Sequence, residues 1–288
     1  MNEKSLGFKF EPSAPDHWHL GEGKASERFG AVELMPGGHG WGKYLPDTEP
    51  QKRNIETMAC TVYASLTAYE TLARFKGFKD FPKDCSERFS AILAEVAPDG
   101  NSPHKSCEAI RKHGVIEEEL LPFTDKMTKG EEYYIPKPMI PEYLELGKEV
   151  LSRFTLGHEY VFNGSIGITS KQDKLIEALG RGTVCVSVKA WKKKGDLYYK
   201  GNEYDNHWTF LVDYKDGEYW VVRDTYAPYD KKLAWDYDFQ TAKLYFLTRK
   251  TEADKKNLLT LLQNLLELLK SKLGMPNPNS EKLYQTAK

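Results

Sequence analysis

The sequence predicts an α+β protein, with helices in its first half and antiparallel strands in its second half. Apolar side chains recur at helical spacing through residues 60–75, which predicts a helix with one buried face. Residues 207–214 and 219–223 alternate as strands do, and Asp216-Gly217 between them is typical of a hairpin turn. With 288 residues, of which 40% are hydrophobic, the chain is long enough for a large globular core.

Charge and composition argue against several classes of protein. The net charge is −1, so nothing in the composition attracts the chain to nucleic acid or to an anionic membrane, and we expect no nucleic-acid partner. The segment that begins Met1-Asn2-Glu3 has no long apolar run, so we expect neither a signal peptide nor an integral membrane segment. A cytoplasmic or virion-associated location is therefore favoured.

The chain has four cysteines, Cys60, Cys85, Cys107 and Cys185. No Cys-x-x-Cys spacing occurs in the sequence, which argues against structural zinc. We expect no metal and no organic cofactor. Cys85 and Cys107 are either a disulfide pair or two free thiols, and the sequence leaves both open.

Residues 1–48 are rich in Gly, Pro, His and charge and show little periodicity. We expect them to form an extended strap that docks through large apolar side chains, namely Phe8, Phe10, Trp18 and Leu20. After the strap, helical patterns cover residues 60–76, 84–97, 104–113, 142–152 and 171–180. Strand patterns cover residues 183–190, 197–200, 207–214, 219–223 and 243–248.

The C-terminal part of the chain is distinct. Leucines recur at helical spacing between Asn257 and Leu273, which predicts an amphipathic leucine-rich helix over residues 251–274. This helix is too short and too often interrupted by polar residues to cross a bilayer. We expect residues 257–273 to mediate self-association or contact with a partner, and residues 275–288 to form a polar tail.

Cys60 stands at the junction between a polar loop and the helix predicted for residues 60–76. A helix N-terminus presents unpaired N–H groups and the positive end of the helix dipole, and both features lower the pKa of a thiol. From this stretch alone, Cys60 is either an activated nucleophile or a buried structural cysteine.

A second stretch favours the nucleophile. His207 begins one strand of the predicted hairpin, and Asp224 follows the end of the other. The hairpin brings the two side chains together, so that His207 can act as a base that Asp224 orients. A cysteine, a histidine and an acid that are distant in sequence but close in the fold form the arrangement of a nucleophile, its base and an orienting group.

The order of these residues resembles that of the papain-like cysteine peptidases, and the resemblance is collinear over residues 45–248. It also covers the segments Asp84–Phe89, Gly114–Phe123, Arg181–Val188, Asn206-His207 and Asp224–Tyr226. The resemblance implies a two-lobed catalytic domain over residues 49–250. A helical lobe would cover residues 55–165, an antiparallel β-sheet lobe would cover residues 166–250, and the leucine-rich helix would be an addition.

The chain departs from the family in three places. The family's Cys-Gly-x-Cys-Trp signature is absent, since Thr61 follows Cys60. The oxyanion-hole Gln of the family lies six positions before the nucleophile, where this chain has Asn54, and Gln51 is further upstream. The third triad member is Asp224 rather than Asn. These departures suggest a divergent branch, of the kind found in phages and uncultured bacteria.

The resemblance implies a peptidase that cleaves amide bonds of peptides or proteins through Cys60, His207 and Asp224, with a thioester acyl-enzyme. The backbone N–H of Cys60 and the side-chain amide of Gln51 would form the oxyanion hole, and Asn54 is the rival of Gln51. A loop after the second predicted helix would pair its main chain with the extended substrate. The candidates in that loop are Gly100, Asn101 and Ser102.

Two other functions stay open. The same three groups suit another thiol acyl-transfer enzyme, such as a transglutaminase-like enzyme or a cell-wall amidase. A papain-like scaffold could also be a non-catalytic structural or binding module. The altered segment before Cys60 favours that interpretation, and the intact triad argues against it. If the strap inhibits the enzyme, it does so by blocking the cleft.

Overall fold

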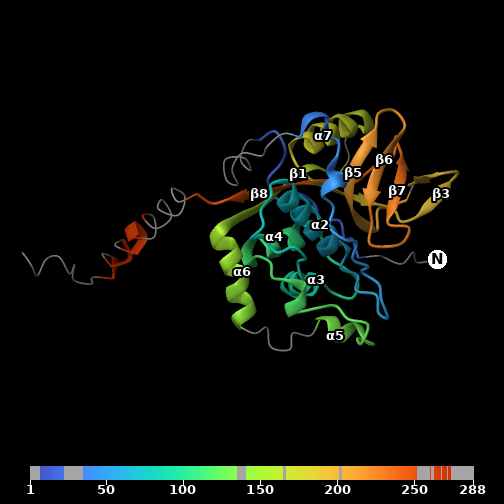
Figure 1. The fold of residues 1–288 in the computed structure, drawn as a ribbon. Helices are drawn as coiled ribbons and strands as arrows, with labels where there is room; N and C mark the ends of the chain where they lie inside the picture. The colour runs from blue at the N-terminus through green and yellow to red at the C-terminus, as the bar shows by residue number, and fades with distance from the viewer. Residues whose placement is uncertain are drawn as a thin grey trace, which may run out of the picture. The chain divides into compact units, whose positions relative to one another are not determined.

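The computed structural model of the chain describes residues 7–22, 35–134, 141–164, 167–200 and 203–251, together with positions 260, 263–266, 268–270 and 272–273. Met1–Thr248 form one compact unit and Arg249–Lys288 form a second. The first unit has the predicted α+β composition, with helices and one eight-stranded sheet among its described residues (Figure 1).

The helices lie close to their predicted positions, except for the helix at Gly130–Tyr134, which the sequence did not predict. The predicted helix that begins with Cys60 is confirmed, and Gly77, with a φ of 66°, follows its end. The helices are α2 (Cys60–Phe75), α3 (Glu87–Leu93), α4 (Pro103–His113), α5 (Gly130–Tyr134), α6 (Pro141–Arg153) and α7 (Ile168–Arg181). Short 3-10 turns are η1 (Pro36–Gly38), η2 (Trp41–Tyr44) and η3 (Glu118–Leu120).

Helix α3 is shorter at both ends than the predicted span 84–97. The hydroxyl of Ser86 caps its N-terminus by accepting a hydrogen bond of 3.1 Å from the N–H of Phe89. Beyond its C-terminus, Glu95 has a φ of 53°, a left-handed conformation that a helix does not continue through.

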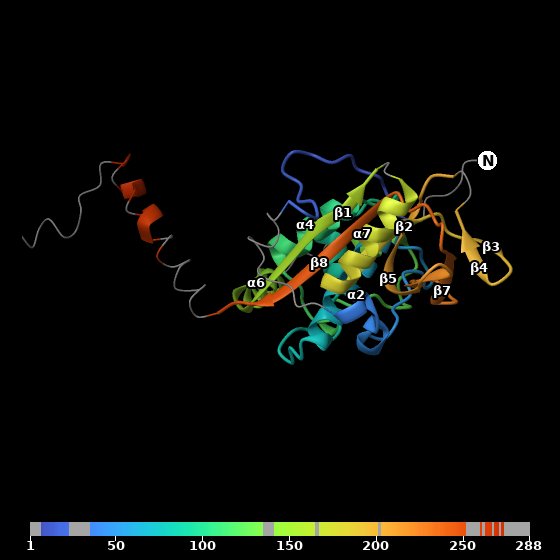
Figure 2. The same cartoon turned by 90° about the horizontal axis from the view of Figure 1, so that it is seen from above.

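The sheet has the order β1-β8-β2-β5-β6-β7-β4-β3 among the described residues. Its strands are β1 (Phe154–Asn163), β2 (Val184–Val188), β3 (Lys192–Lys194), β4 (Leu197–Tyr199), β5 (His207–Lys215), β6 (Tyr219–Arg223), β7 (Asp230–Ala234) and β8 (Thr241–Arg249). Strands β5 and β6 form the predicted hairpin, and β7 extends it antiparallel to β6. Figure 2 shows the long strands β1 and β8 side by side.

The sequence did not predict β1, β3 or β7. Strand β1 is buried along almost its whole length, so it lacks the alternation of polar and apolar side chains that marks a half-exposed strand. It also buries His158 and Glu159, which made it look like a polar segment. Strand β7 is short and begins Asp230-Lys231-Lys232, although the Lys231 side chain points into the protein.

Helix α2 packs on the sheet in a way that sets the position of Cys60. The Thr183 hydroxyl donates to the carbonyl of Ala68 (3.1 Å), and the Cys185 thiol donates to the carbonyl of Ala64 (3.2 Å). Moving one turn towards the N-terminus of α2 therefore corresponds to moving two residues towards the C-terminus of β2. One more turn reaches Cys60, near the end of β2 where Val188 pairs with His207.

All four cysteines belong to the described residues, and all are buried and free. The disulfide alternative for Cys85 and Cys107 is therefore wrong, and the free-thiol alternative is confirmed. Cys107 instead lies next to the hydroxyls of Tyr245 (3.4 Å) and Ser65 (3.7 Å).

In the second unit, positions 263–266 and 268–270 are helical, as the leucine pattern predicts. Several leucines there are exposed, namely Leu265, Leu266, Leu268, Leu269 and Leu273. The predicted helix positions 252–259 and the predicted tail 275–288 lie outside the described residues. Among the residues that the structure describes, no helix is both long and apolar enough to cross a membrane.

Candidate active site

Cys60 is the first residue of α2 and is fully buried. Its neighbour Ala59 offers no side-chain cap, and no acidic residue lies in the first turn. No acidic side chain in that turn therefore offsets the positive end of the helix dipole beside the sulfur of Cys60.

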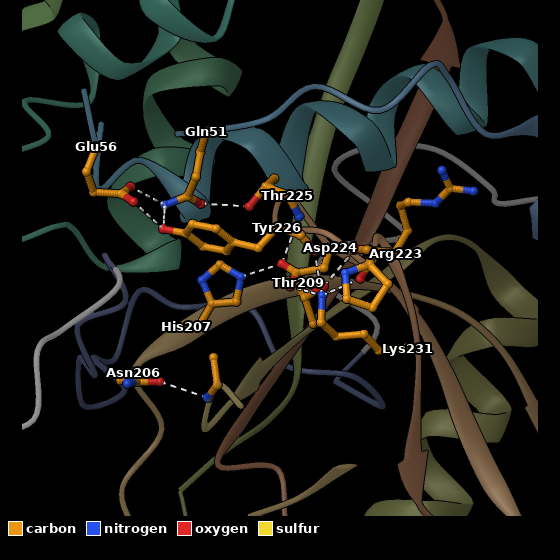
Figure 3. Close-up of polar contacts among 12 residues, drawn as sticks. Gln51, Glu56, Asn206, His207, Thr209, Arg223, Asp224, Thr225, Tyr226 and Lys231 are labelled. Atoms are coloured by element: carbon orange, nitrogen blue, oxygen red, sulfur yellow. Dashed lines mark hydrogen bonds and ion pairs between the residues drawn. The ribbon is translucent and has the colours of Figure 1, made fainter. Parts of the chain in front are cut away.

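His207 and Asp224 meet at the base of the β5–β6 hairpin. Nε2 of His207 lies 2.6 Å from Oδ1 of Asp224, and both side chains are fully buried (Figure 3). The register of the hairpin explains the contact, because Phe210 pairs with Arg223, so that His207 lies just beyond the paired residues on the side of Asp224. The second Oδ1 contact of Asp224 is the N–H of Thr225, at 2.7 Å.

The environment favours the charged forms of both groups. Burial lowers the pKa of His207, but Asp224 and the sulfur of Cys60 raise it more, and the net pKa is about 10. Burial raises the pKa of Asp224, but His207 and then Lys231 outweigh it, so the pKa lies below its usual range. The site therefore supports an imidazolium between a carboxylate and a sulfur.

Gln51 lies next to this pair, and its rival Asn54 does not. The amide oxygen of Gln51 accepts a hydrogen bond of 2.8 Å from the hydroxyl of Thr225, one residue after Asp224. Asn54 is on the surface side of the loop, where its amide donates to the backbone carbonyl of Asp125. The geometry therefore favours Gln51 over Asn54 as the amide of the site.

Glu56 is a member of the site that the sequence did not reveal. Its carboxylate accepts hydrogen bonds from the Gln51 amide (2.9 Å) and from the Tyr226 hydroxyl (2.7 Å) (Figure 3). The Gln51 amide also donates to the Tyr226 hydroxyl at 2.8 Å. The centroid of the Tyr226 ring lies 5.4 Å from that of the His207 ring, so the tyrosine packs beside the histidine.

The predicted substrate loop divides into two parts. The main chain of Asn101 is paired with another segment, whereas Ser102 is the N-cap of α4, where its hydroxyl accepts from the N–H of Lys105 (3.2 Å). Gly100 has a φ of 97° and lies against the backbone of Gly7, so that a side chain at Gly100 would overlap it. Gly100 and Asn101 therefore contact the strap through their main chain, whereas Ser102 caps the helix and also donates its hydroxyl to the carboxylate of Glu11.

The partner of Asn101 is the strap itself. The N–H of Asn101 donates to the carbonyl of Gly7 (2.8 Å), and the N–H of Lys9 donates to the carbonyl of Asn101 (2.9 Å). This is a parallel bridge between Phe8 and Asn101. On the other side, the N–H of Phe8 contacts the carbonyl of Asn206 at 3.4 Å, next to His207.

The strap passes directly over Cys60. A Cβ atom on Gly7 would overlap the carbonyl of Met58 and lie 3.1 Å from the sulfur of Cys60. Phe8 is buried and stacks on Trp208, with ring centroids 5.9 Å apart and an interplanar angle of 5°. Of the other predicted docking residues, Leu20 is buried, Trp18 is half-buried and Phe10 is exposed.

Comparisons with known proteins bear on the fold. The sequence matches no protein-family model and gives no match among curated proteins. The structure resembles digestive procathepsin L2 proteinase from Tenebrio molitor, with a TM-score of 0.57, 14% identity, and coverage of 84% of this chain and 78% of the other. It also resembles xylellain, a cysteine protease from Xylella fastidiosa, with a TM-score of 0.52, 15% identity, and coverage of 86% and 97%.

A third similar structure contains the cysteine protease and lectin-like domains of Cwp84, a surface layer associated protein of Clostridium difficile. Its TM-score is 0.55 and its identity is 12%, over 77% of this chain and 54% of the other. At these identities the similarity establishes the fold. The papain-like α+β fold that the sequence predicts is therefore confirmed.

Proposed function

We propose that this chain is a papain-like cysteine peptidase in which Cys60 is the nucleophile, His207 the base and Asp224 the orienting acid. One observation carries the proposal. Nε2 of His207 lies 2.6 Å from Oδ1 of Asp224, and both side chains are fully buried on a papain-like fold. The sulfur of Cys60, which raises the pKa of the same imidazole, stands at the N-terminus of α2. The placement in a divergent branch rests on the sequence departures alone.

The proposed mechanism begins with transfer of the Cys60 proton to His207, which Asp224 holds in orientation. The thiolate attacks the carbonyl carbon of the scissile amide and forms a tetrahedral intermediate. His207 then gives its proton to the leaving amine, and a thioester remains on Cys60. Water, deprotonated by His207, releases the acid product and restores the thiol.

The oxyanion would be held by the backbone N–H of Cys60 and by the amide of Gln51. In this structure Glu56 and Tyr226 accept hydrogen bonds from that amide. Gln51 would therefore redirect one N–H from Glu56 to the substrate when the substrate carbonyl enters. The main chain of Gly100 and Asn101 would pair with the substrate after the strap leaves, with peptides or proteins as the substrate class.

The test is labelling of the folded chain with a peptidyl epoxide of the papain-inhibitor class, followed by mass mapping. The probe should modify Cys60 in the wild type and in a variant that lacks residues 1–10, with faster modification in the shortened form. His207→Ala should abolish the modification. Cys85 and Cys185 are internal references, because burial raises the pKa of both thiols and should keep them unmodified.

Two outcomes would count against the proposal. One is the absence of labelling in both forms of a chain whose circular dichroism shows it to be folded. The other is equal labelling of Cys60 and the reference cysteines. If Cys60 is labelled by the epoxide, and unlabelled enzyme given a peptide substrate passes the acyl group of its thioester to an added amine rather than to water, the chain is a transglutaminase-like acyl-transfer enzyme instead.

One specific observation favours the alternative of a non-catalytic module. The strap lies across Cys60, and Phe8 fills the space beside Trp208. A binding module would keep that contact permanently. A peptidase must be able to lose it, so labelling of Cys60 in the intact chain favours the peptidase, whereas labelling of the shortened form alone favours the module.

A further inference from the structure

Lys231 on β7 makes direct contact with the far side of Asp224. Its Nζ lies 2.6 Å from Oδ2 of Asp224, and only 1% of the Lys231 side chain is exposed. The same ammonium donates to the backbone carbonyls of Tyr226 and Pro228, each at 2.6 Å (Figure 3). All three N–H donors of the lysine therefore have acceptors, which fixes its position.

The Trp191 ring completes this enclosure, with its centroid 4.8 Å from the Lys231 ammonium. Trp191 also lies edge-on to His207, with ring centroids 5.8 Å apart. Lys231 and His207 thus both contact the Asp224 carboxylate and the Trp191 indole. The pairing of β5, β6 and β7 holds the two residues in place.

Charge balance explains why a lysine is needed there. A thiolate, an imidazolium and an ionised Asp224 together carry one excess negative charge, and the Glu56 carboxylate beside Tyr226 adds no positive charge to offset it. A buried charge without a partner costs several kcal/mol, so such a site needs either a neutral third member or a buried cation. An Asn in place of the acid would be the neutral third member. This chain has Asp224 instead, and Lys231 is the buried cation.

We propose that Lys231 is a positioning residue of the proposed peptidase, which keeps Asp224 ionised and aimed at Nε2 of His207. This inference rests on the proposed function of the same site. Lys231 does not touch the reacting atoms, and its effect passes through Asp224 to the imidazole.

The proposal predicts that the effects of changing Asp224 and Lys231 are not additive. Lys231→Met leaves a buried carboxylate unpaired, and Asp224→Asn leaves a buried ammonium unpaired. Each single variant should label Cys60 at least about tenfold more slowly than the wild type. The double variant Asp224→Asn/Lys231→Met has no unpaired charge, and Asn can still orient the imidazole. Its labelling rate should recover to within about threefold of the wild type.

A matched control is Lys171→Met. Lys171 of α7 is also buried and also pairs with an aspartate, the half-exposed Asp238 between β7 and β8, at 2.5 Å. Its loss should reduce stability without moving the pH profile of labelling. In Lys231→Met the acid limb of that profile should move to higher pH, because burial without the lysine favours protonated Asp224.

A second readout does not depend on reactivity. In full-length chain labelled with ¹⁵N-histidine, His207 is assigned by its loss in His207→Ala. At pH 7 its ring nitrogens should show the imidazolium form in the wild type and in Lys171→Met. They should move towards neutral imidazole in Lys231→Met, because a protonated Asp224 no longer stabilises the charge.

These measurements separate the two proposals. Wild-type labelling together with additive losses in the double variant and an unchanged imidazole signal in Lys231→Met would overturn the role of Lys231 alone. Absence of labelling in the wild type together with a shifted imidazole signal in Lys231→Met would overturn the peptidase proposal and leave the role of Lys231 at Asp224 supported.

Discussion

Gly7 is the residue that lets the strap lie close to the sulfur of Cys60. Its φ is 110°, a conformation that favours glycine, and any side chain there would overlap the Met58 carbonyl. Gly7→Val should therefore push the strap out of the cleft. We expect iodoacetamide to alkylate Cys60 at least about tenfold faster in this variant, as measured by mass mapping.

Gly21→Val is the matched control for this variant. Gly21 is also in the strap and also has a positive φ, 91°, but a side chain there meets no atom within 4 Å. Its backbone strain is therefore similar, and its effect on Cys60 should be small. Equal acceleration in both variants would mean that strain in the strap, and not the contact at Gly7, controls access to the thiol.

Glu70 of α2 should make the stability depend on pH. It is buried and accepts a hydrogen bond of 2.6 Å from the N–H of Cys85, and burial raises its pKa to about 8. Between about pH 4.5 and pH 8 the folded state thus binds more protons at Glu70 than the unfolded state, so the free energy of unfolding falls as pH rises.

Glu70→Gln keeps the acceptor oxygen and removes the titration. Between about pH 5 and pH 8, the Tm measured by circular dichroism should fall less in the variant than in the wild type. The corresponding difference in the free energy of unfolding is on the order of 2 kcal/mol. The exposed Glu131→Gln serves as the control and should follow the wild type. Parallel curves for wild type and Glu70→Gln would contradict the prediction.

The residues of the candidate site differ in how far the sequence revealed them. Cys60, His207 and Asp224 follow from a helix start and a hairpin, which are local patterns. The positions of Glu56 and Lys231 are set by the loop before α2 and the loop between β6 and β7, and local sequence patterns do not predict where such loops place a side chain. A signal for Lys231 was nonetheless present. It stands two positions before the apolar Leu233 in β7, so both side chains lie on the inward face of the strand.

At the scale of elements, the strap is docked onto α4 through a pair of histidines. The rings of His17 and His104 lie 3.9 Å apart, and His158 of β1 is 5.5 Å from His104. Burial and then Lys243 lower the pKa of His17, and burial, Lys243 and His17 lower that of His104, to about 3. The acidic groups that act in the opposite direction are Glu11, Asp16 and Glu108.

Docking of the strap should therefore weaken in acid. Below the ordinary histidine pKa of 6.5 a released His17 or His104 binds a proton that the docked one rejects, so protonation favours release. Hydrogen exchange of residues 14–20 should be faster at about pH 5 than at about pH 7.5, after correction for intrinsic rates. His17→Phe/His104→Phe should reduce this difference, whereas His113→Gln at the far end of α4 should not.

Elements whose side chains carry a helical period or a turn signal were predictable, and β1, which carries neither, was not. In the helix at residues 60–75 the large apolar side chains recur at helical spacing, although the helix is buried on nearly all sides, and the Asp216-Gly217 turn marks the 207–223 hairpin. Strand β1 is buried on both faces and contains buried polar groups that only tertiary contacts satisfy, such as His158 with Glu108 at 3.1 Å.

At the scale of the whole molecule, the second unit carries partly exposed leucines among its described residues. Leu265, Leu266 and Leu269 are about half exposed, and we propose that self-association buries them. Leu265→Asp/Leu269→Asp should convert the protein to a monomer in sedimentation velocity. Gln263→Asp/Asn264→Asp, on exposed polar positions of the same helix, should not. A wild type that is monomeric at high concentration would refute the proposal.

The strap also has a consequence for how affinity would be measured. A segment attached to the same chain acts on the cleft as an internal competitor, whose effective concentration is set by the tether and reaches the millimolar range for short linkers. An external peptide binds only the open fraction of molecules, so its apparent dissociation constant equals the intrinsic one divided by that fraction. A weak ligand could therefore reflect a well-formed cleft that is already taken. Comparing the intact chain with Gly7→Val would measure the open fraction directly.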